Sequence, residues 1–272
     1  MSAPRTVAQI VPSGRGAAAR PVFGAEQQHA MALGRSSRSG AEIGDLVLLE
    51  PRGRGVRVGE ILGRSDHAGA VQRGLILAEG LDESFPAAVE REAEAVPGPV
   101  DRVDLRAQEV VTIDPEGARD HDDALYARHD GDDVRLWVHI ADVSAFVPEG
   151  GAVDLEAARR GNSYYLPGRV VPMLPESLSG DACSLRAGVE RPAVTAELVI
   201  AGDGRIVTSR FQRSLVRSRR DLTYADAAAI LAAGPPPELD ALAEGARRLR
   251  AARRRRGALE ILSGEPRFQL SG

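Results

Sequence analysis

The stretch "TIDPEGARDHDDALY", residues 112–126, places four aspartates within ten positions: Asp114, Asp120, Asp122 and Asp123. Like charges this close repel one another, and each unit of pKa shift that results corresponds to about 1.4 kcal/mol. A segment with a purely structural role has no reason to keep four such groups together. We therefore expect these carboxylates to bind a ligand of opposite charge.

Side-chain alternation gives the four aspartates different directions. Residues 109–114 predict a strand that Asp114 closes, and a Pro-Glu-Gly turn follows it. If the returning segment is extended, Asp122 and Asp123 point to opposite sides and cannot chelate one ion in the same way. We therefore expect some carboxylates to hold a metal while another faces the substrate or a second metal. Oxygen ligands favour Mg²⁺ or Mn²⁺ over zinc, although His121 within the cluster is a contrary hint.

Two other interpretations of the cluster remain open at this point. Acidic loops are commonly just solvated, and a calcium-binding loop also supplies spaced aspartates. An EF-hand requires Gly at its sixth position and Glu at its twelfth, where this chain has Arg119 and Leu125. A calcium-binding structural module is therefore the weaker alternative.

Charge is distributed unevenly along the 272 residues, whose 43% hydrophobic content is ordinary for a soluble globular protein of two modest domains. The net charge is −4, and every basic residue is arginine. Sixteen acidic residues face six arginines between residues 66 and 131, whereas fourteen arginines face seven acidic residues between 205 and 272. Such segregation can steer a polyanion toward one face.

The cellular setting is predicted from what the sequence lacks. Cys183 is the single cysteine, which excludes an intramolecular disulfide and fits a reducing compartment. The N-terminal residues lack the apolar core of a signal peptide, and no apolar run reaches membrane-spanning length. We expect a cytoplasmic protein without membrane contact.

The N-terminal region, residues 1–65, predicts a small β-barrel of the oligonucleotide-binding or cold-shock type, because short strands alternate with glycine-rich turns. The strands are expected at 6–11, 20–24, 45–51 and 56–62. Residues 66–106 predict an acidic helical connector. Its helix is expected near residues 83–98, with Ser84 as a possible cap and Pro97-Gly98 as the stop.

Residues 107–272 alternate strands with helices, which indicates a mixed α/β domain and an α+β fold class for the chain. A hairpin is expected to turn at Asp203-Gly204. The last helix is strongly basic toward its C-terminal end. Besides residues 109–114, strands are expected at 132–143 and in the 193–211 hairpin, and helices at 152–161, 223–234 and 238–259.

An aromatic segment, residues 162–186, contains Tyr164 and Tyr165 followed by Leu-Pro-Gly and Arg169. Single-stranded nucleic acid is bound by such a combination, because bases stack on rings and phosphates pair with arginine. Alternation lets only one of the two tyrosines face a cleft, so the other is expected in the core.

Three further polar residues have mainly structural interpretations. His139 is more often a satisfied structural histidine than a base. Asp142 could hold the side chains of the aspartate site in place without contacting the ligand itself. Cys183 is most simply a small buried hydrophobic residue.

Taken together, several strings resemble the catalytic domain of the ribonuclease II / ribonuclease R family, the RNB domain. They occur in the family's order from about residue 107 to residue 258: "TIDPEGARDHDDAL", "VHIADVSAFV", "AARRGNSYYLPGRVVPMLPESLS", "CSL", "RFQRSLVRSRRDLTYADA" and "RGAL". The resemblance implies processive 3′→5′ hydrolysis of single-stranded RNA to nucleoside 5′-monophosphates, with Mg²⁺ or possibly Mn²⁺ and no small-molecule cofactor.

The resemblance also implies roles for single residues. Asp114, Asp120 and Asp123 fall on metal-site positions, and Asp122 falls on the essential catalytic carboxylate. Tyr165 falls on the ring that stacks near the RNA 3′ end. Tyr224 matches a position implicated in substrate contact.

The chain also departs from the family. His121 stands where an apolar residue is usual, and the sequence stops at Gly272, about halfway through the expected domain. We therefore expect a fragment that is inactive alone and poorly folded beyond residue 107, with strands such as 193–201 lacking partners. The leading alternative is a non-catalytic RNA-binding protein that retains the RNB fold.

Overall fold

The computed structural model describes residues 5–14, 16–23, 29–94 and 100–259. The chain divides into two compact units. One contains residues up to 85 together with 157–173, and the other contains residues 86–156 and 174–259 of the described part.

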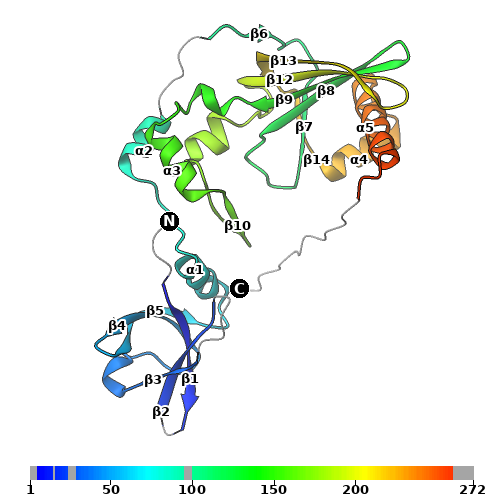
Figure 1. Ribbon diagram of the computed structural model, residues 1–272. Coiled ribbons are helices and arrows are strands. Elements are labelled where there is room, and N and C mark those ends of the chain that lie inside the picture. The colour runs from blue at the N-terminus through cyan, green and yellow to red at the C-terminus, as the bar shows by residue number, and fades with distance from the viewer. Residues whose placement is uncertain (1–4, 15, 24–28, 95–99, 260–272) are drawn as a thin grey trace. The chain divides into compact units, whose positions relative to one another are not determined.

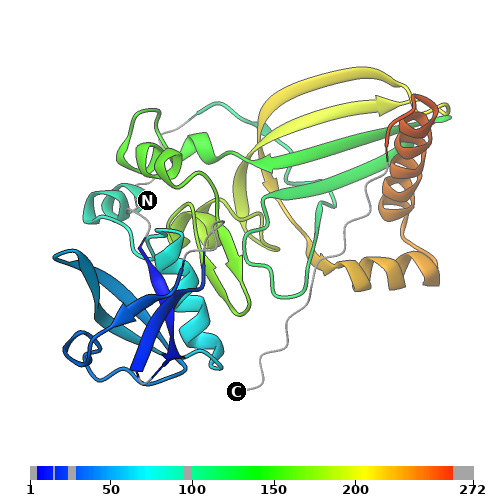
Figure 2. The ribbon, with the colours of Figure 1, turned by 60° about the horizontal axis from the view of Figure 1, so that its bottom comes forward.

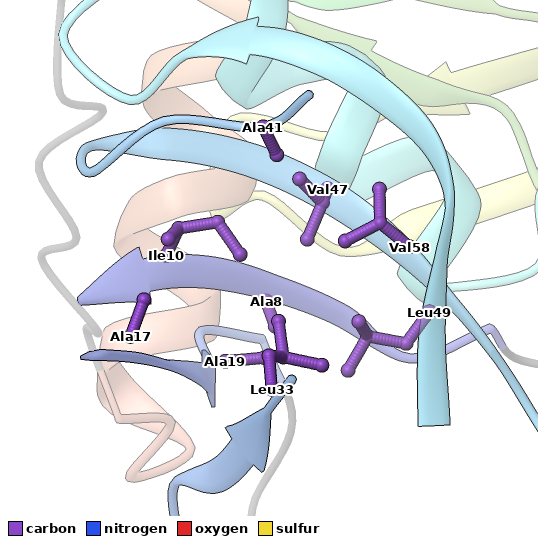
Figure 3. Close-up of a cluster of buried hydrophobic side chains, with 9 residues drawn as sticks. All are labelled: Ala8, Ile10, Ala17, Ala19, Leu33, Ala41, Val47, Leu49 and Val58. Carbon is purple, nitrogen blue, oxygen red and sulfur yellow. The ribbon is translucent and has the colours of Figure 1, made fainter. Parts of the chain in front are cut away.

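The first unit begins with a five-stranded antiparallel sheet in the order β3-β2-β1-β4-β5. Its outer strands contact each other, so the sheet curls into a small barrel. Small apolar side chains from the strands and the adjoining turn fill its interior, as Figure 3 shows. The strands are β1 (Val7–Ser13), β2 (Gly16–Pro21), β3 (Met31–Leu33), β4 (Asp45–Arg52) and β5 (Gly55–Arg64).

The barrel confirms the expected fold, but two of its elements differ from the prediction. The second strand ends at Pro21 instead of spanning 20–24, and β3 was not predicted. Helix α1 (Ala68–Ala78) was also not predicted within the connector. It packs on the barrel through Ala70, and a Cβ on Gly74 would lie only 2.9 Å from the Phe23 ring. Glycine at this position allows the close approach of helix and barrel.

A two-stranded hairpin, β10 (Tyr164–Leu166) and β11 (Arg169–Val171), completes the first unit. Buried Arg160 fixes the chain around it, because its guanidinium donates to the backbone oxygens of Asp82 at 2.8 Å and Pro172 at 3.0 Å. It also donates to the Ser84 oxygen at 2.6 Å and lies over the Phe85 ring. The expectation that Ser84 caps a helix is wrong, because the N-cap position of the following helix is Pro86 and no side chain caps that helix.

Two short helices precede and follow the first strands of the second unit. In α2 (Ala87–Ala93), the N-cap position is Pro86. Glu92 of α2 accepts hydrogen bonds from the first backbone amides of α3 (Ala152–Arg160) at 2.8 and 3.0 Å. These bonds satisfy donors that a helix start leaves open. The expected stop at Pro97-Gly98 lies outside the described residues.

The second unit is built on a seven-stranded sheet in the order β14-β7-β8-β9-β12-β13-β6. The pairs β14–β7 and β13–β6 are parallel and the others are antiparallel. The strands are β6 (Val103–Asp104), β7 (Val111–Asp114), β8 (Asp123–Asp130), β9 (Asp133–Ala141), β12 (Glu190–Ile200), β13 (Ile206–Arg217) and β14 (Arg220–Thr223).

The long hairpin of this sheet confirms one prediction and overturns another. β12 and β13 turn at residues 201–205, with Gly204 at φ +79°. The expectation that the strand at 193–201 lacks partners is wrong. β12 pairs with β9 on one side and β13 on the other, so it lies inside the sheet.

Two helices follow the sheet, α4 (Tyr224–Ala233) and α5 (Pro237–Arg255). Helix α5 covers one end of β8, β9 and β12, as Figure 1 shows. Gly245 permits this packing, since a Cβ there would lie 3.3 Å from Val134. The β12–β13 turn also meets α5 in Figure 2, and a Cβ on Gly204 would collide with the Arg248 backbone oxygen. None of the helices in the described ranges is long and apolar enough to cross a membrane.

Candidate active site

Two of the four aspartates lie where neighbouring strands meet one edge of the seven-stranded sheet. Asp114 is the last residue of β7, and Asp123 is the first residue of β8. Because these strands are antiparallel, the end of one lies beside the start of the other. Asp120 and Asp122 lie in the loop between them and are exposed. The sequence pattern therefore placed the cluster correctly at a strand end and its returning loop.

The electrostatics of Asp123 confirm that the carboxylates lie within range of one another. Burial raises the pKa of the half-buried Asp123 carboxyl, and the negative charges of Asp122 and Asp114 raise it further. Asp122 is exposed while Asp123 is half-buried, which fits the expected alternation.

Asp114 has a partner that the sequence pattern did not reveal. His121 Nδ1 lies 2.7 Å from Asp114 Oδ2, and both side chains are largely shielded from solvent. The loop backbone around the histidine is fixed from a distant segment. Buried Ser184 accepts from the His121 amide at 3.2 Å and donates to the Arg119 backbone oxygen at 2.7 Å. His121 therefore holds one oxygen of Asp114 in a defined position.

Parallel pairing brings the expected substrate residue Tyr224 to the same edge. Thr223, the last residue of β14, lies opposite Asp114 in the register, and Tyr224 follows it as the first residue of α4. A capping box fixes this junction, because Thr223 Oγ1 accepts from the Asp226 amide and Asp226 accepts from the Thr223 amide, each at 3.1 Å. Tyr224 is 62% exposed, so its ring is open to a ligand.

Tyr165 and Arg169 belong to the first compact unit. Tyr164 packs against buried Ile76 and Val171, whereas Tyr165 is 66% exposed. The prediction that only one of the two tyrosines is available is therefore confirmed. Arg169 is ion-paired with Glu83.

Three further polar residues were given mainly structural interpretations. That of Cys183 is confirmed, whereas that of His139 is confirmed only in part, because its buried Nε2 has no hydrogen-bond partner within the described residues. The expectation that Asp142 supports the aspartate site stays a prediction. His139 is fully buried, its Nδ1 lies 2.8 Å from Thr195 Oγ1, and burial lowers its pKa to about 4. Cys183 is buried, and burial raises the pKa of its thiol to about 11. Asp142 is buried in an ion pair with Arg102 at 2.7 Å.

The chemistry of the donor set can be compared with what a metal requires. Carboxylate oxygens are the ligands that Mg²⁺ and Mn²⁺ prefer, and the like-charge repulsion around Asp123 is what a cation would relieve. Within the described ranges, however, no three His, Cys, Asp or Glu side chains already form a metal-holding group. The donors fit a hard divalent ion, while their present arrangement leaves Asp114 on His121.

Comparison with known proteins points to one family. The family model described as "RNB domain" matches residues 102–272. Ribonuclease R of Vibrio cholerae is 36% identical over 263 residues, which cover 88% of this chain and 32% of the relative. The chain thus spans about a third of that relative's length.

Solved structures share the fold. A structure of Mycoplasma genitalium RNase R in complex with double-stranded RNA superposes with a TM-score of 0.80 at 24% identity, covering 94% of this chain and 49% of that one. Yeast Ssd1, described as a pseudonuclease, has a TM-score of 0.68 at 16% identity, covering 93% of this chain and 34% of that one.

Proposed function

The chain belongs to the RNB-domain family, and from this premise we propose that it is part of a 3′→5′ exoribonuclease that hydrolyses single-stranded RNA to nucleoside 5′-monophosphates. The observation that carries the proposal is the set of three aspartates at one sheet edge, where the charges of Asp114 and Asp122 act on half-buried Asp123. Asp120 lies in the loop that joins their strands. In this proposal residues 1–65 form the cold-shock-like barrel, 66–106 the connector and 107–272 a portion of the catalytic domain. The single cysteine supports a cytoplasmic location.

We assign the metal to three carboxylates and the reacting centre to the fourth. Asp114, Asp120 and Asp123 would hold Mg²⁺ or Mn²⁺, which when bound would activate water and neutralise charge on the leaving 3′-oxygen. His121 lies 2.7 Å from one oxygen of Asp114, and the other oxygen would bind the ion. Asp122, which is exposed, would orient the reacting group.

The RNA contacts follow from exposure. Tyr224 lies beside the aspartate edge and would contact the substrate near the scissile phosphate. Tyr165 would stack on a base near the 3′ end, with a contribution of about 1–3 kcal/mol per base. Arg169 would meet a phosphate in exchange for Glu83.

The experiment that tests this function is a turnover assay on 3′-labelled single-stranded RNA with Mg²⁺, applied both to this chain and to a longer version. Mononucleotide release by either protein, lost in its Asp122→Asn variant, supports the proposal. RNA left intact by both proteins at all concentrations of Mg²⁺ and Mn²⁺ would refute it.

A non-catalytic RNA-binding role is the second candidate. The likeness to yeast Ssd1, described as a pseudonuclease, favours it, because this fold is compatible with loss of catalysis. RNA binding without turnover by the longer version would select this alternative.

A further inference from the structure

The C-terminal half of α5 contains a concentration of positive charge that neither the fold nor the aspartate site uses. All three acidic residues of the helix occur up to Glu244, and all six of its arginines follow. With 3.6 residues per turn, four of the arginines fall on the side opposite buried Ala241, Gly245 and Ala252. We call these four the arginine stripe: Arg247, Arg250, Arg253 and Arg254.

The other two arginines of the helix attach it to the sheet. Arg248 donates to the Asp132 backbone oxygen at 2.8 Å and to Glu244 at 2.6 Å, and Arg255 donates to the Asp203 backbone oxygen. These residues hold α5 to the β8–β9 and β12–β13 turns, beside which the helix lies in Figure 2. The four arginines of the stripe therefore lie on a helix whose position relative to the sheet is fixed.

The side chains of the stripe are largely available. Arg250, Arg253 and Arg254 are exposed, and Arg247 pairs with Glu244 at 2.6 Å while keeping 70% of its side chain exposed. Within the described ranges, neither Arg250 nor Arg253 has an ion-pair partner. Arg256, just beyond the helix, is also exposed.

Helix stability accounts for only part of the stripe, because Arg253 and Arg254 lie in the last turn of α5 and Arg250 does not. Cations near a helix C-terminus stabilise it, but only within the last turn. Arg250 lies more than a turn before Arg255, the end of the helix. Arg250 also stands three and four positions from Arg253 and Arg254, where like charges destabilise a helix. An external polyanion would relieve this repulsion.

The stripe is well separated from the aspartate edge within the same unit. Helix α5 packs on β8 from Ala127 onward, and Arg248, in the half of the helix that carries the stripe, donates to the Asp132 backbone oxygen in the turn that follows β8. Asp123 lies at the opposite end of the strand. The eight residues of β8 place the two ends roughly 23 Å apart at about 3.3 Å per residue. A flexible polyanion engaged at the aspartates could extend to the stripe, whereas a mononucleotide could not.

We propose that the arginine stripe of α5 is a sequence-independent binding site for the phosphate backbone of RNA, distinct from the aspartate edge. It rests on the proposed function for the identity of the polyanion. Guanidinium groups pair with phosphate oxygens, and a row of them along a helix contacts successive phosphates. The stripe would hold the body of the RNA while its 3′ end is at the aspartates.

Salt dependence of binding tests the stripe directly. Affinity for fluorescein-labelled oligouridylate is measured by anisotropy across a salt series, with Mg²⁺ omitted so that hydrolysis does not interfere. The Arg250→Gln/Arg253→Gln variant should lower the slope of log K against log salt by about 1.4, since each phosphate contact to a single strand contributes about 0.7. A fourfold rise in salt would then weaken this variant about sevenfold less than the parent chain.

Two matched variants distinguish an effect of the stripe on RNA binding from an effect of the total positive charge of the protein. Arg250→Lys/Arg253→Lys keeps both charges and should keep the parent slope. Arg54→Gln/Arg91→Gln removes two exposed arginines elsewhere and should leave the slope unchanged. Thermal melting checks that every variant folds. We expect only a small change of stability in the stripe variant, because the loss of a cation from the last turn of α5 is offset by the removal of the repulsion between Arg250 and Arg253.

The outcomes distinguish this inference from the nuclease proposal. An unchanged slope in the glutamine stripe variant, or an equal change in the Arg54/Arg91 control, overturns the stripe as a site. Absence of RNA binding by the parent chain at low salt overturns it as well. Failure to hydrolyse RNA that still binds through the stripe refutes only the nuclease.

Discussion

Two carboxylates at the same edge of the seven-stranded sheet have opposite electrostatic surroundings. Burial alone would raise the pKa of Asp142, but hydrogen bonds from Ser144 at 2.6 Å and Arg102 at 2.7 Å outweigh it and lower the pKa. Asp123 has no such donor within the described ranges, and burial and the nearby negative charges raise its pKa.

The difference indicates how the fold treats charge with a structural role and charge with a functional role. Where a carboxylate serves stability, the chain supplies its own cation, as Arg102 does for Asp142. Where a carboxylate is left among like charges, as Asp123 is, an outside cation or substrate would relieve the repulsion. The aspartate edge is therefore the part of the sheet that remains electrostatically incomplete.

The largest expected effect is that of Asp122→Asn in a longer version of the protein. It should lower the rate of RNA hydrolysis by about 10²–10⁴-fold, the range for a positioned acid–base group, while RNA affinity is kept. Single-turnover kinetics and anisotropy measure the two quantities. A loss of affinity as large as the loss of rate would mean that Asp122 is structural, like Asp142.

Asp142→Asn should instead lower stability, because it leaves partly buried Arg102 without its counter-charge. Breaking a buried pair by removing one partner costs about 3–5 kcal/mol, so urea unfolding of the second unit should shift to a much lower midpoint. Exposed Asp122→Asn serves as its control and should unfold as the parent chain does. Equal midpoints for the Asp142 variant and the parent would remove the contrast between the two carboxylates.

Acid should lower the free energy of unfolding, because buried His139 resists protonation in the folded protein. Its folded pKa of about 4 lies below the ordinary value of 6.5, so the unfolded chain binds more protons between these values and stability falls as the pH decreases through this window. Between about pH 7.5 and pH 5 the loss should be roughly 2 kcal/mol.

The variant His139→Asn removes the titrating group and can still donate to Thr195. The pH dependence of its unfolding free energy should be shallower than that of the parent by the same amount. If the unfolding free energies of the parent and the variant depend on pH in the same way, His139 is not the group that makes the protein less stable in acid.

The smallest effect is expected from Tyr165→Ala. It applies the contrast between structural and functional residues to the two tyrosines of the first unit. Loss of one stacking surface, worth about 1–3 kcal/mol per base, should change the length of the final undegraded oligonucleotide while hydrolysis continues. Tyr164→Ala, which removes a ring packed on Ile76, should instead lower thermal stability. Identical end products in the parent and Tyr165→Ala would exclude the stacking role.

The local sequence pattern was sufficient to predict much of the structure of this molecule. Strand alternation predicted that Asp122 and Asp123 differ in exposure and that Tyr164 and Tyr165 do so too, with Tyr164 partly buried and Tyr165 exposed. Turn chemistry located the β12–β13 hairpin at Asp203-Gly204, and periodicity located α3, α4 and α5. These features depend on neighbours a few residues apart, so the sequence carries them directly.

Local pattern failed where packing chooses the structure. Helix α1 begins after His67 without a side-chain cap hydrogen bond. Its apolar residues, read without the barrel that they contact, do not distinguish helix from loop. Strand β3 has three residues, too few for a periodic signal.

What the sequence by itself determined is which chemical groups are present at the site and in what order. Only the tertiary structure decided which of them meet. Parallel pairing of β7 with β14 brings Thr223 opposite Asp114, and Ser184 fixes a loop 63 residues before it. The choice of strand partners depends on the free energy of the whole packed sheet, to which no short window of sequence gives access.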